Sequence, residues 1–159
     1  MDYGIICPWC ICRESVVLGV KLVDNNKCFA CGVANPHGLK LEFEWDGEEY
    51  FCDFYTDERY QGYTGVMHGG ITATILDEVM AKHLNTRGMG VVTAGMELRY
   101  KKPVPTGVTV RCVARQDSVK RNIYVMTAVV ILPDGDVAVE ATGKFVRLVG
   151  ANDVKEEQV

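Results

Sequence analysis

Three consecutive residues, His68, Gly69 and Gly70, combine a titratable side chain with a sterically open backbone just before an amphipathic stretch. Glycines at a helix start let another group approach the backbone closely, and the first-turn N–H groups lack partners within the helix. Together with the helix dipole, these N–H groups make a site for an oxyanion or a polarised carbonyl. A plain glycine turn has the same pattern, so these residues alone leave both interpretations open.

Asp77 lies in the same stretch, and its neighbours three and four residues away on each side are small or apolar. A carboxylate there is expected on a helix face that is buried or lines a cleft. Burial raises the pKa of a carboxylate unless hydrogen bonds or cations compensate, which suits a base or a nucleophile. A hydrogen-bonded structural carboxylate is the alternative. Glu78 has Lys82 four residues on, so we expect a solvated ion pair there.

The separation between the glycines and Asp77 limits how they can act together. Asp77 follows Gly70 by seven residues, which is about 10 Å along a helix axis at about 1.5 Å per residue. A carbonyl bound at the helix N-terminus is then out of reach of Asp77 in the same chain. Either the two act independently, or Asp77 serves a site that another subunit completes, which points to a dimer.

The elements that must position these residues follow from the periodicity of the apolar side chains. Apolar residues recur at helical spacing from 68 to about 87, where Gly88 and Gly90 end the predicted helix. Strict alternation predicts a half-buried strand at 39–46, joined through a hairpin turn at Asp46-Gly47 to its neighbour. The remaining predicted strands are 50–55, 96–101, 108–116, 123–132 and 137–148. One long helix with this much antiparallel sheet predicts an α+β fold, with the helix packed on a single curved sheet.

Composition excludes several classes of protein. The chain has 159 residues, 48% of them apolar, and a net charge of −4, which argues against a nucleic-acid-binding domain. No apolar run reaches the length of about 18 residues that a membrane span requires. Seven cysteines without a secretory signal fit a reducing, cytoplasmic setting. We expect one folded domain at 28–150, preceded by a cysteine-containing extension at 1–27 and followed by a polar tail at 151–159.

Several segments in order carry a resemblance to a known family. The helix segment 67–78 reads MHGGITATILDE, and it is preceded by YQGYTG at 60–65 and followed by RYKKPVPTG at 99–107. The opening segments are CFACG at 28–32 and NPHGL at 35–39. Over roughly residues 28–148 the chain resembles the hotdog-fold thioesterase superfamily, in particular the PaaI-like acyl-CoA thioesterases of the phenylacetate pathway.

The resemblance implies a curved antiparallel sheet wrapped around one long central helix, with two protomers paired sheet to sheet and the active site between them. It implies hydrolysis of an aryl- or short- to medium-chain acyl-CoA to the free acid and CoA. Gly69 would supply an oxyanion-hole N–H, and the partner's Asp77 would be the base or nucleophile. Gln61 is the candidate for positioning the thioester, although its spacing departs by about one residue from the family pattern. Thr93 matches the hydroxyl that orients the attacking water.

The remaining candidates concern substrate binding and assembly. His68 either polarises the thioester or braces the glycine turn, and the sequence leaves both roles open. Gly70 would contact the substrate, while Lys101 and Arg121 lie at strand ends where CoA phosphates could bind. Solvated surface cations are the alternative for these two residues. The expected assembly is a homodimer or a dimer of dimers, and no cofactor is required for catalysis.

The cysteines support a second hypothesis. Cys7 and Cys10 form one C-x-x-C pair and Cys28 and Cys31 form another, with 17 residues between the two pairs, a spacing typical of a structural zinc site. A non-catalytic acyl-CoA-binding or sensing protein with a zinc-binding extension is therefore the alternative to an enzyme. A hydratase on the same fold is disfavoured, because those enzymes carry a different His/Asp arrangement. The other cysteines are expected to pack as small apolar residues, namely Cys12, Cys52 and Cys112.

Overall fold

The structure, a computed structural model, describes residues 15–17, 20–22 and 25–147, the first two ranges for their backbone only. Those two ranges are a short antiparallel pair, β1 (Ser15–Val17) and β2 (Val20–Leu22). Most of the predicted 1–27 extension, including Cys7, Cys10 and Cys12, and the 151–159 tail lie outside the described residues.

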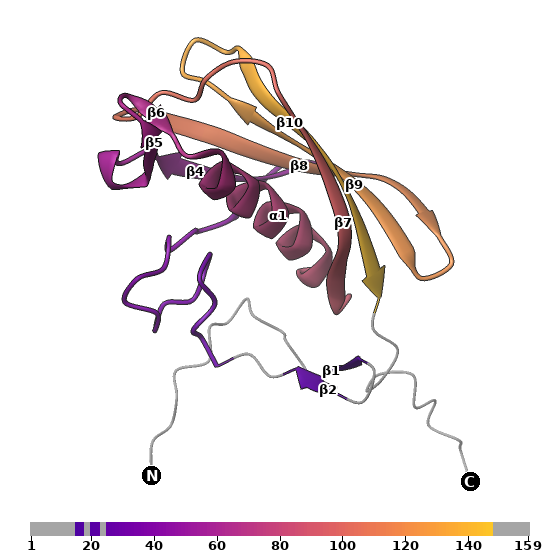
Figure 1. Cartoon of the computed structure of the whole chain (residues 1–159). Helices are drawn as coiled ribbons and strands as arrows, with labels where there is room; N and C mark the ends of the chain where they lie inside the picture. Colours follow the sequence, from indigo (N-terminus) through magenta and orange to yellow (C-terminus); the bar gives the residue numbers. More distant parts are fainter. Residues whose placement is uncertain (1–14, 18–19, 23–24, 148–159) are drawn as a thin grey trace, which may run out of the picture.

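One six-stranded antiparallel sheet dominates the fold and curves around a single long helix (Figure 1). The helix is α1 (Gly69–Asn85), close to the predicted range. The spatial order of the strands is β3-β4-β8-β9-β10-β7, which leaves β3 and β7 at the two edges. In chain order the strands are β3 (Glu44–Asp46), β4 (Glu49–Tyr55), β7 (Val91–Tyr100), β8 (Thr109–Lys120), β9 (Ile123–Ile131) and β10 (Val137–Arg147). The α+β prediction, a curved antiparallel sheet around one central helix, is confirmed.

The core lies between α1 and the concave face of the sheet. The helix stripe is completely buried, and the strands facing it contribute side chains that are equally inaccessible; together they include Ile75, Leu76, Val79, Met80, Leu84, Val110, Met126, Val130 and Phe145. Gly143 on β10 makes room for this packing, because a Cβ there would lie 3.1 Å from the Met80 methyl carbon. The helix therefore sits directly on the sheet, which holds its N-terminus and Asp77 in fixed positions.

A short segment connects β4 to the helix and leads into its N-terminus. It consists of the 3-10 helix η1 (Glu58–Tyr60) and the small antiparallel pair β5 (Gln61–Tyr63) and β6 (Val66–Met67). The N–H of Met67 donates to the carbonyl of Val104 at 2.9 Å, which attaches this pair to the loop after β7. This bond anchors the chain just before His68 and the two glycines.

The predicted strand at 39–46 is only partly right. Leu39 and Leu41 are buried as the alternation predicts, but β3 begins at Glu44. Lys40 has a φ of 59°, which interrupts an extended strand. The N–H groups of Leu39 and Leu41 instead donate to the carbonyls of Phe29 and Ala30, so this segment packs along the Cys28–Cys31 turn.

The other strand predictions hold with longer elements. β7 begins at Val91 rather than residue 96, and β8 continues to Lys120 across an irregularity between Gln116 and Ser118. Cys52 and Cys112 are each 1% exposed and face one another across β4 and β8, which confirms their predicted packing role. Among the described residues, no helix has the length and apolar character required to cross a membrane.

Candidate active site

The N-terminus of α1 is capped by His68. Its φ of −63° and ψ of 130° are those of an extended N-cap residue, and its Nδ1 accepts the N–H of Gly70 at 2.9 Å. A Cβ on Gly70 would lie 3.0 Å from that nitrogen, so the glycine gives the ring room to fold over the turn. His68 therefore braces the glycine turn, and the same bond occupies the N–H of Gly70.

The N–H of Gly69 is the donor that stays open at this end of the helix. In the part of the chain that the structure describes it has no hydrogen-bond partner, as expected for the first helical residue. The carbonyl of Gly69 accepts the hydroxyl of Tyr100 at 2.7 Å. Partial loss of solvation raises the pKa of Tyr100. Sequence reasoning missed Tyr100, whose signal was its position at the end of the strand after the helix.

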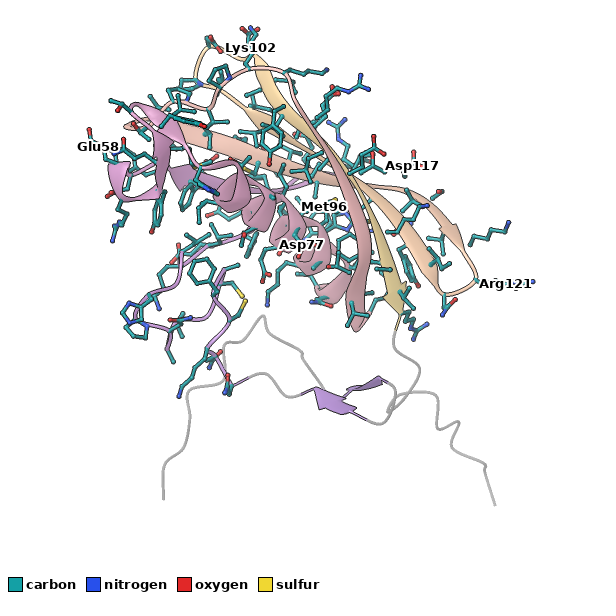
Figure 2. All side chains as sticks on the ribbon, viewed as in Figure 1. Glu58, Asp77, Met96, Lys102, Asp117 and Arg121 are labelled. Carbon is teal, nitrogen blue, oxygen red and sulfur yellow. The ribbon has the colours of Figure 1, made fainter. Side chains whose placement is uncertain are left out.

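Asp77 and Thr93 form the second half of the candidate site. The Thr93 hydroxyl on β7 donates to Oδ1 of Asp77 at 2.8 Å, and the carboxylate is half-buried. Loss of solvation raises the pKa of Asp77, and the hydrogen bond from Thr93 opposes that rise. Figure 2 shows Asp77 on α1 beside β7, the strand that carries Thr93 and Met96. β7 is a sheet edge, so this carboxylate lies beside an open edge of the sheet.

The predicted ion pair of Glu78 with Lys82 is present, but the prediction that it is exposed to solvent is wrong. Lys82 does approach Glu78, at 4.0 Å, but the two side chains are only 16% and 12% exposed rather than solvated. Helix packing places Glu78 against the Cys28–Cys31 turn, where its carboxylate lies 3.8 Å from the Cys28 sulfur. Burial raises the pKa of Glu78. A hydrogen bond from Cys31 lowers the pKa of Cys28 to about 5.

The other predicted site residues form no hydrogen bond or ion pair with the helix N-terminus or with Asp77 in the described part of the chain. Gln61 begins β5, and its Oε1 accepts the N–H of Gly65 at 3.4 Å, within its own loop. Lys101 is ion-paired with Glu140 on β10. Arg121 has a φ of 57° in the turn between β8 and β9, well away from Asp77 along the sheet (Figure 2). The structure thus joins His68, Gly69 and Gly70 to Tyr100, joins Asp77 to Thr93, and leaves Arg121 apart.

Comparisons with known proteins agree with this architecture. Residues 64–139 match the family model described as the thioesterase superfamily. Acyl-coenzyme A thioesterase THEM4 of Bos taurus is 29% identical over 104 residues, which are 65% of this chain and 43% of the relative. The chain thus spans less than half the length of that relative.

Solved structures extend the likeness across the sheet. The thioesterase superfamily protein RHA08564 is 25% identical with a TM-score of 0.69, covering 74% of this chain and 61% of that one. PaaI of E. coli, from the phenylacetic acid degradation operon, is 17% identical with a TM-score of 0.66, covering 71% and 83%. A hypothetical thioesterase from Streptococcus pneumoniae TIGR4, solved with coenzyme A, is 18% identical with a TM-score of 0.63, covering 67% and 87%.

Proposed function

We propose that this chain belongs to the thioesterase superfamily and hydrolyses acyl-CoA thioesters, because residues 64–139 match that family model and its fold is the hotdog fold. The relatives named acyl-coenzyme A thioesterases support this substrate class, and the coenzyme A found with the pneumococcal protein supports it further. The proposed acyl group is aryl or short to medium aliphatic. The free thiols of Cys52 and Cys112, neighbours across two strands, are consistent with a reducing compartment such as the cytoplasm.

The pairing of Asp77 with Thr93 carries the proposal. A half-buried carboxylate with a raised pKa is a stronger base than a solvated one, and Thr93 bonds only Oδ1 in the described part of the chain. The other oxygen then accepts a proton from water while that water attacks the thioester carbonyl. A protein that only bound acyl-CoA would gain nothing from burying a negative charge beside an anionic ligand.

The open N–H of Gly69 is the proposed oxyanion donor. As the water adds, negative charge develops on the carbonyl oxygen, and a preorganised N–H at a helix N-terminus stabilises it. His68 holds the turn, and Tyr100 fixes the following peptide through its bond to the Gly69 carbonyl. When the tetrahedral intermediate collapses, the carbon–sulfur bond breaks and the CoA thiolate takes up the proton that Asp77 received. The products are the free acid and CoA.

The active assembly is proposed to be a homodimer that places the partner's Asp77 opposite Gly69. Asp77 lies eight residues beyond Gly69, about 12 Å along the axis at about 1.5 Å per residue, so one chain cannot bring both groups to one carbonyl. The unpaired edge of β7 carries Thr93 and is exposed over much of its length. Pairing two such edges would bring the two helices together, and two dimers could associate further.

The test is a panel of aryl- and alkyl-CoA thioesters, with released thiol followed in wild-type protein and in Asp77→Ala. We expect turnover of at least one member, and a loss of about 10²-fold or more in the variant, the range for removing a general base. Asp117→Asn is the matched control, because Asp117 is exposed on β8 away from Asp77 (Figure 2) and should leave the rate unchanged. Binding of acyl-CoA without turnover of any panel member would favour the sensing protein instead.

A further inference from the structure

Two cysteines and a glutamate that the proposed reaction does not use lie together beside α1. The sulfur atoms of Cys28 and Cys31 and a carboxylate oxygen of Glu78 all lie within 4.8 Å of one another. The Cys28 sulfur is 3.8 Å from Oε1 and 3.9 Å from Oε2 of Glu78. The cysteines belong to the turn that precedes β3 by sequence, whereas Glu78 comes from the middle of the helix, 50 residues later.

The turn is built to hold its two sulfurs in one place. The N–H of Gly32 donates to the Cys28 carbonyl at 2.9 Å, and a Cβ on Gly32 would lie 2.4 Å from the Cys28 nitrogen, so only glycine fits. Lys40 reaches back across the turn and donates to the carbonyls of Gly32 and Val33, each at 2.8 Å.

Glu78 adds a carboxylate oxygen to the two sulfurs in a partly dry environment. Its carboxylate is only 16% exposed, and the ammonium of Lys82 is 4.0 Å away. Metal binding releases the protons of cysteine thiols, and a divalent cation compensates the charge of the two thiolates and the carboxylate that then surround it. A divalent cation at the centre of the cluster would satisfy all three groups.

We propose that Cys28, Cys31 and Glu78 bind a zinc ion that fastens the cysteine turn to the central helix. Zinc bonds thiolate sulfur at about 2.3 Å and carboxylate oxygen at about 2.1 Å, so tetrahedral sulfur and oxygen ligands stand about 3.6 Å apart. The sulfur–oxygen distance of 3.8 Å is close to that value. Two soft thiolates exclude magnesium and calcium, which take oxygen ligands, and favour zinc.

Glu78 distinguishes this site from the one predicted by cysteine spacing. Two C-x-x-C pairs predict four sulfur ligands, but Cys7 and Cys10 lie outside the described residues. With Glu78 as the third ligand, the fourth tetrahedral position is taken by water or by another donor. The metal would then hold the residue next to Asp77, so it would stiffen the same turn of the helix that carries the proposed base. This inference does not depend on the chain being a thioesterase.

The experiment measures zinc directly in the full chain, purified under reducing conditions. We expect one zinc per chain by inductively coupled plasma mass spectrometry. A chelator that removes the zinc should lower the melting temperature of the protein. Cys31→Ser should lose the metal, and its melting temperature should no longer respond to chelator. Glu78→Gln preserves shape but removes the charge, and it should weaken zinc affinity at least about 10-fold, the lower end of the loss seen for an outer-shell partner.

Two comparisons keep the assignment falsifiable. Glu58→Gln, an exposed glutamate in η1 away from the turn (Figure 2), should retain zinc as the wild type does. In the cobalt-substituted protein, the intensity of the thiolate-to-metal charge-transfer band reports the number of sulfur ligands. A wild-type chain that takes up no zinc overturns the proposal. So does Glu78→Gln with wild-type affinity together with loss of zinc in Cys7→Ser and Cys10→Ser, which is the result for a four-cysteine site.

Discussion

Asp77 and Glu78 are adjacent in sequence, yet they belong to two different regions of the molecule. Successive helical residues point about 100° apart, so Asp77 faces Thr93 on β7 while Glu78 faces Cys28 and Lys82. Burial raises the pKa of both carboxyl groups. The difference lies in what each one faces, which is an open sheet edge for Asp77 and a closed turn of the same chain for Glu78.

The comparison shows that burial alone does not identify a catalytic carboxylate. Glu78 is surrounded by groups from its own chain that can complete a metal site, and so we infer a structural role for it. Asp77 has one partner, Thr93, among the described residues and lies beside the edge that another subunit would cover. Changes on the Asp77 side should therefore affect turnover and depend on subunit pairing, whereas changes on the Glu78 side should affect zinc and stability within each chain.

The largest loss of activity is expected from replacing Gly69 at the N-terminus of α1. Gly69→Pro removes the proposed oxyanion N–H, and proline is tolerated at the first helical position after an extended residue such as His68. We expect a loss of about 10²–10³ in kcat/KM, as for removal of one oxyanion donor. Zinc content should stay at the wild-type value, which separates the two sides.

Gly69→Ala is the control for that substitution. It adds a Cβ 3.3 Å from the Tyr100 hydroxyl, as proline does, but keeps the N–H. Alanine should therefore retain most of the activity, within about threefold of the wild type if crowding against Tyr100 is the only change. Equal losses in the alanine and proline variants would assign the effect to crowding and remove Gly69 as the donor.

Subunit mixing gives the next largest effect and tests the comparison itself. If Gly69 of one protomer works with the partner's Asp77, then unfolding and refolding Gly69→Pro together with Asp77→Ala should produce heterodimers with one intact site each. Random pairing of equal amounts restores about a quarter of the wild-type activity. Glu78→Gln mixed in the same way with Cys31→Ser should restore no zinc binding, because those ligands come from one chain. Recovery of zinc binding without recovery of turnover would mean that the zinc ligands come from two protomers and that Gly69 and Asp77 do not act together across the dimer.

The sequence predicted the helix and most strands better than the contacts made by the loops between them. Apolar periodicity located α1 to within two residues at each end, because the helix packs on the sheet along one continuous stripe. It failed at 39–43, where the left-handed backbone of Lys40 and hydrogen bonds to the cysteine turn replace a strand. Those contacts join segments about ten residues apart through loop geometry, which has no period to detect.

Residue spacing predicted the candidate site only along the helix, whereas Thr93 on β7 was predicted from the family resemblance. His68, Gly69, Gly70 and Asp77 share one element, so spacing alone revealed them. The contact between Glu78 and Cys28 spans 50 residues, and the i,i+4 rule that paired Glu78 with Lys82 says nothing about which face the core covers. Tyr100 was missed for the same reason, because its bond to Gly69 depends on how the end of β7 meets the start of α1.

The smallest predicted effect comes from Thr93, a positioning residue for Asp77. Thr93→Val keeps the shape of the side chain but removes the hydroxyl, and a hydrogen bond to a charged group contributes about 1.5–3 kcal/mol. Because the carboxylate still functions as a base, we expect a loss of about 10-fold in kcat/KM, well below the effect of replacing Asp77 itself. Glu78, whose carboxylate Thr93 does not touch, should keep its zinc.

The pH profile distinguishes positioning from a general loss of structure in that variant. The base is active when ionised, so activity falls as pH drops through the pKa of Asp77. Thr93 holds that pKa down, and therefore its removal should move the acid limb of kcat/KM to higher pH. The profile is measured at fixed zinc content, with Thr93→Ser as the variant that restores the hydroxyl. An acid limb that stays in place in Thr93→Val while activity falls would mean that the bond between Thr93 and Asp77 supports the fold and does not tune the base.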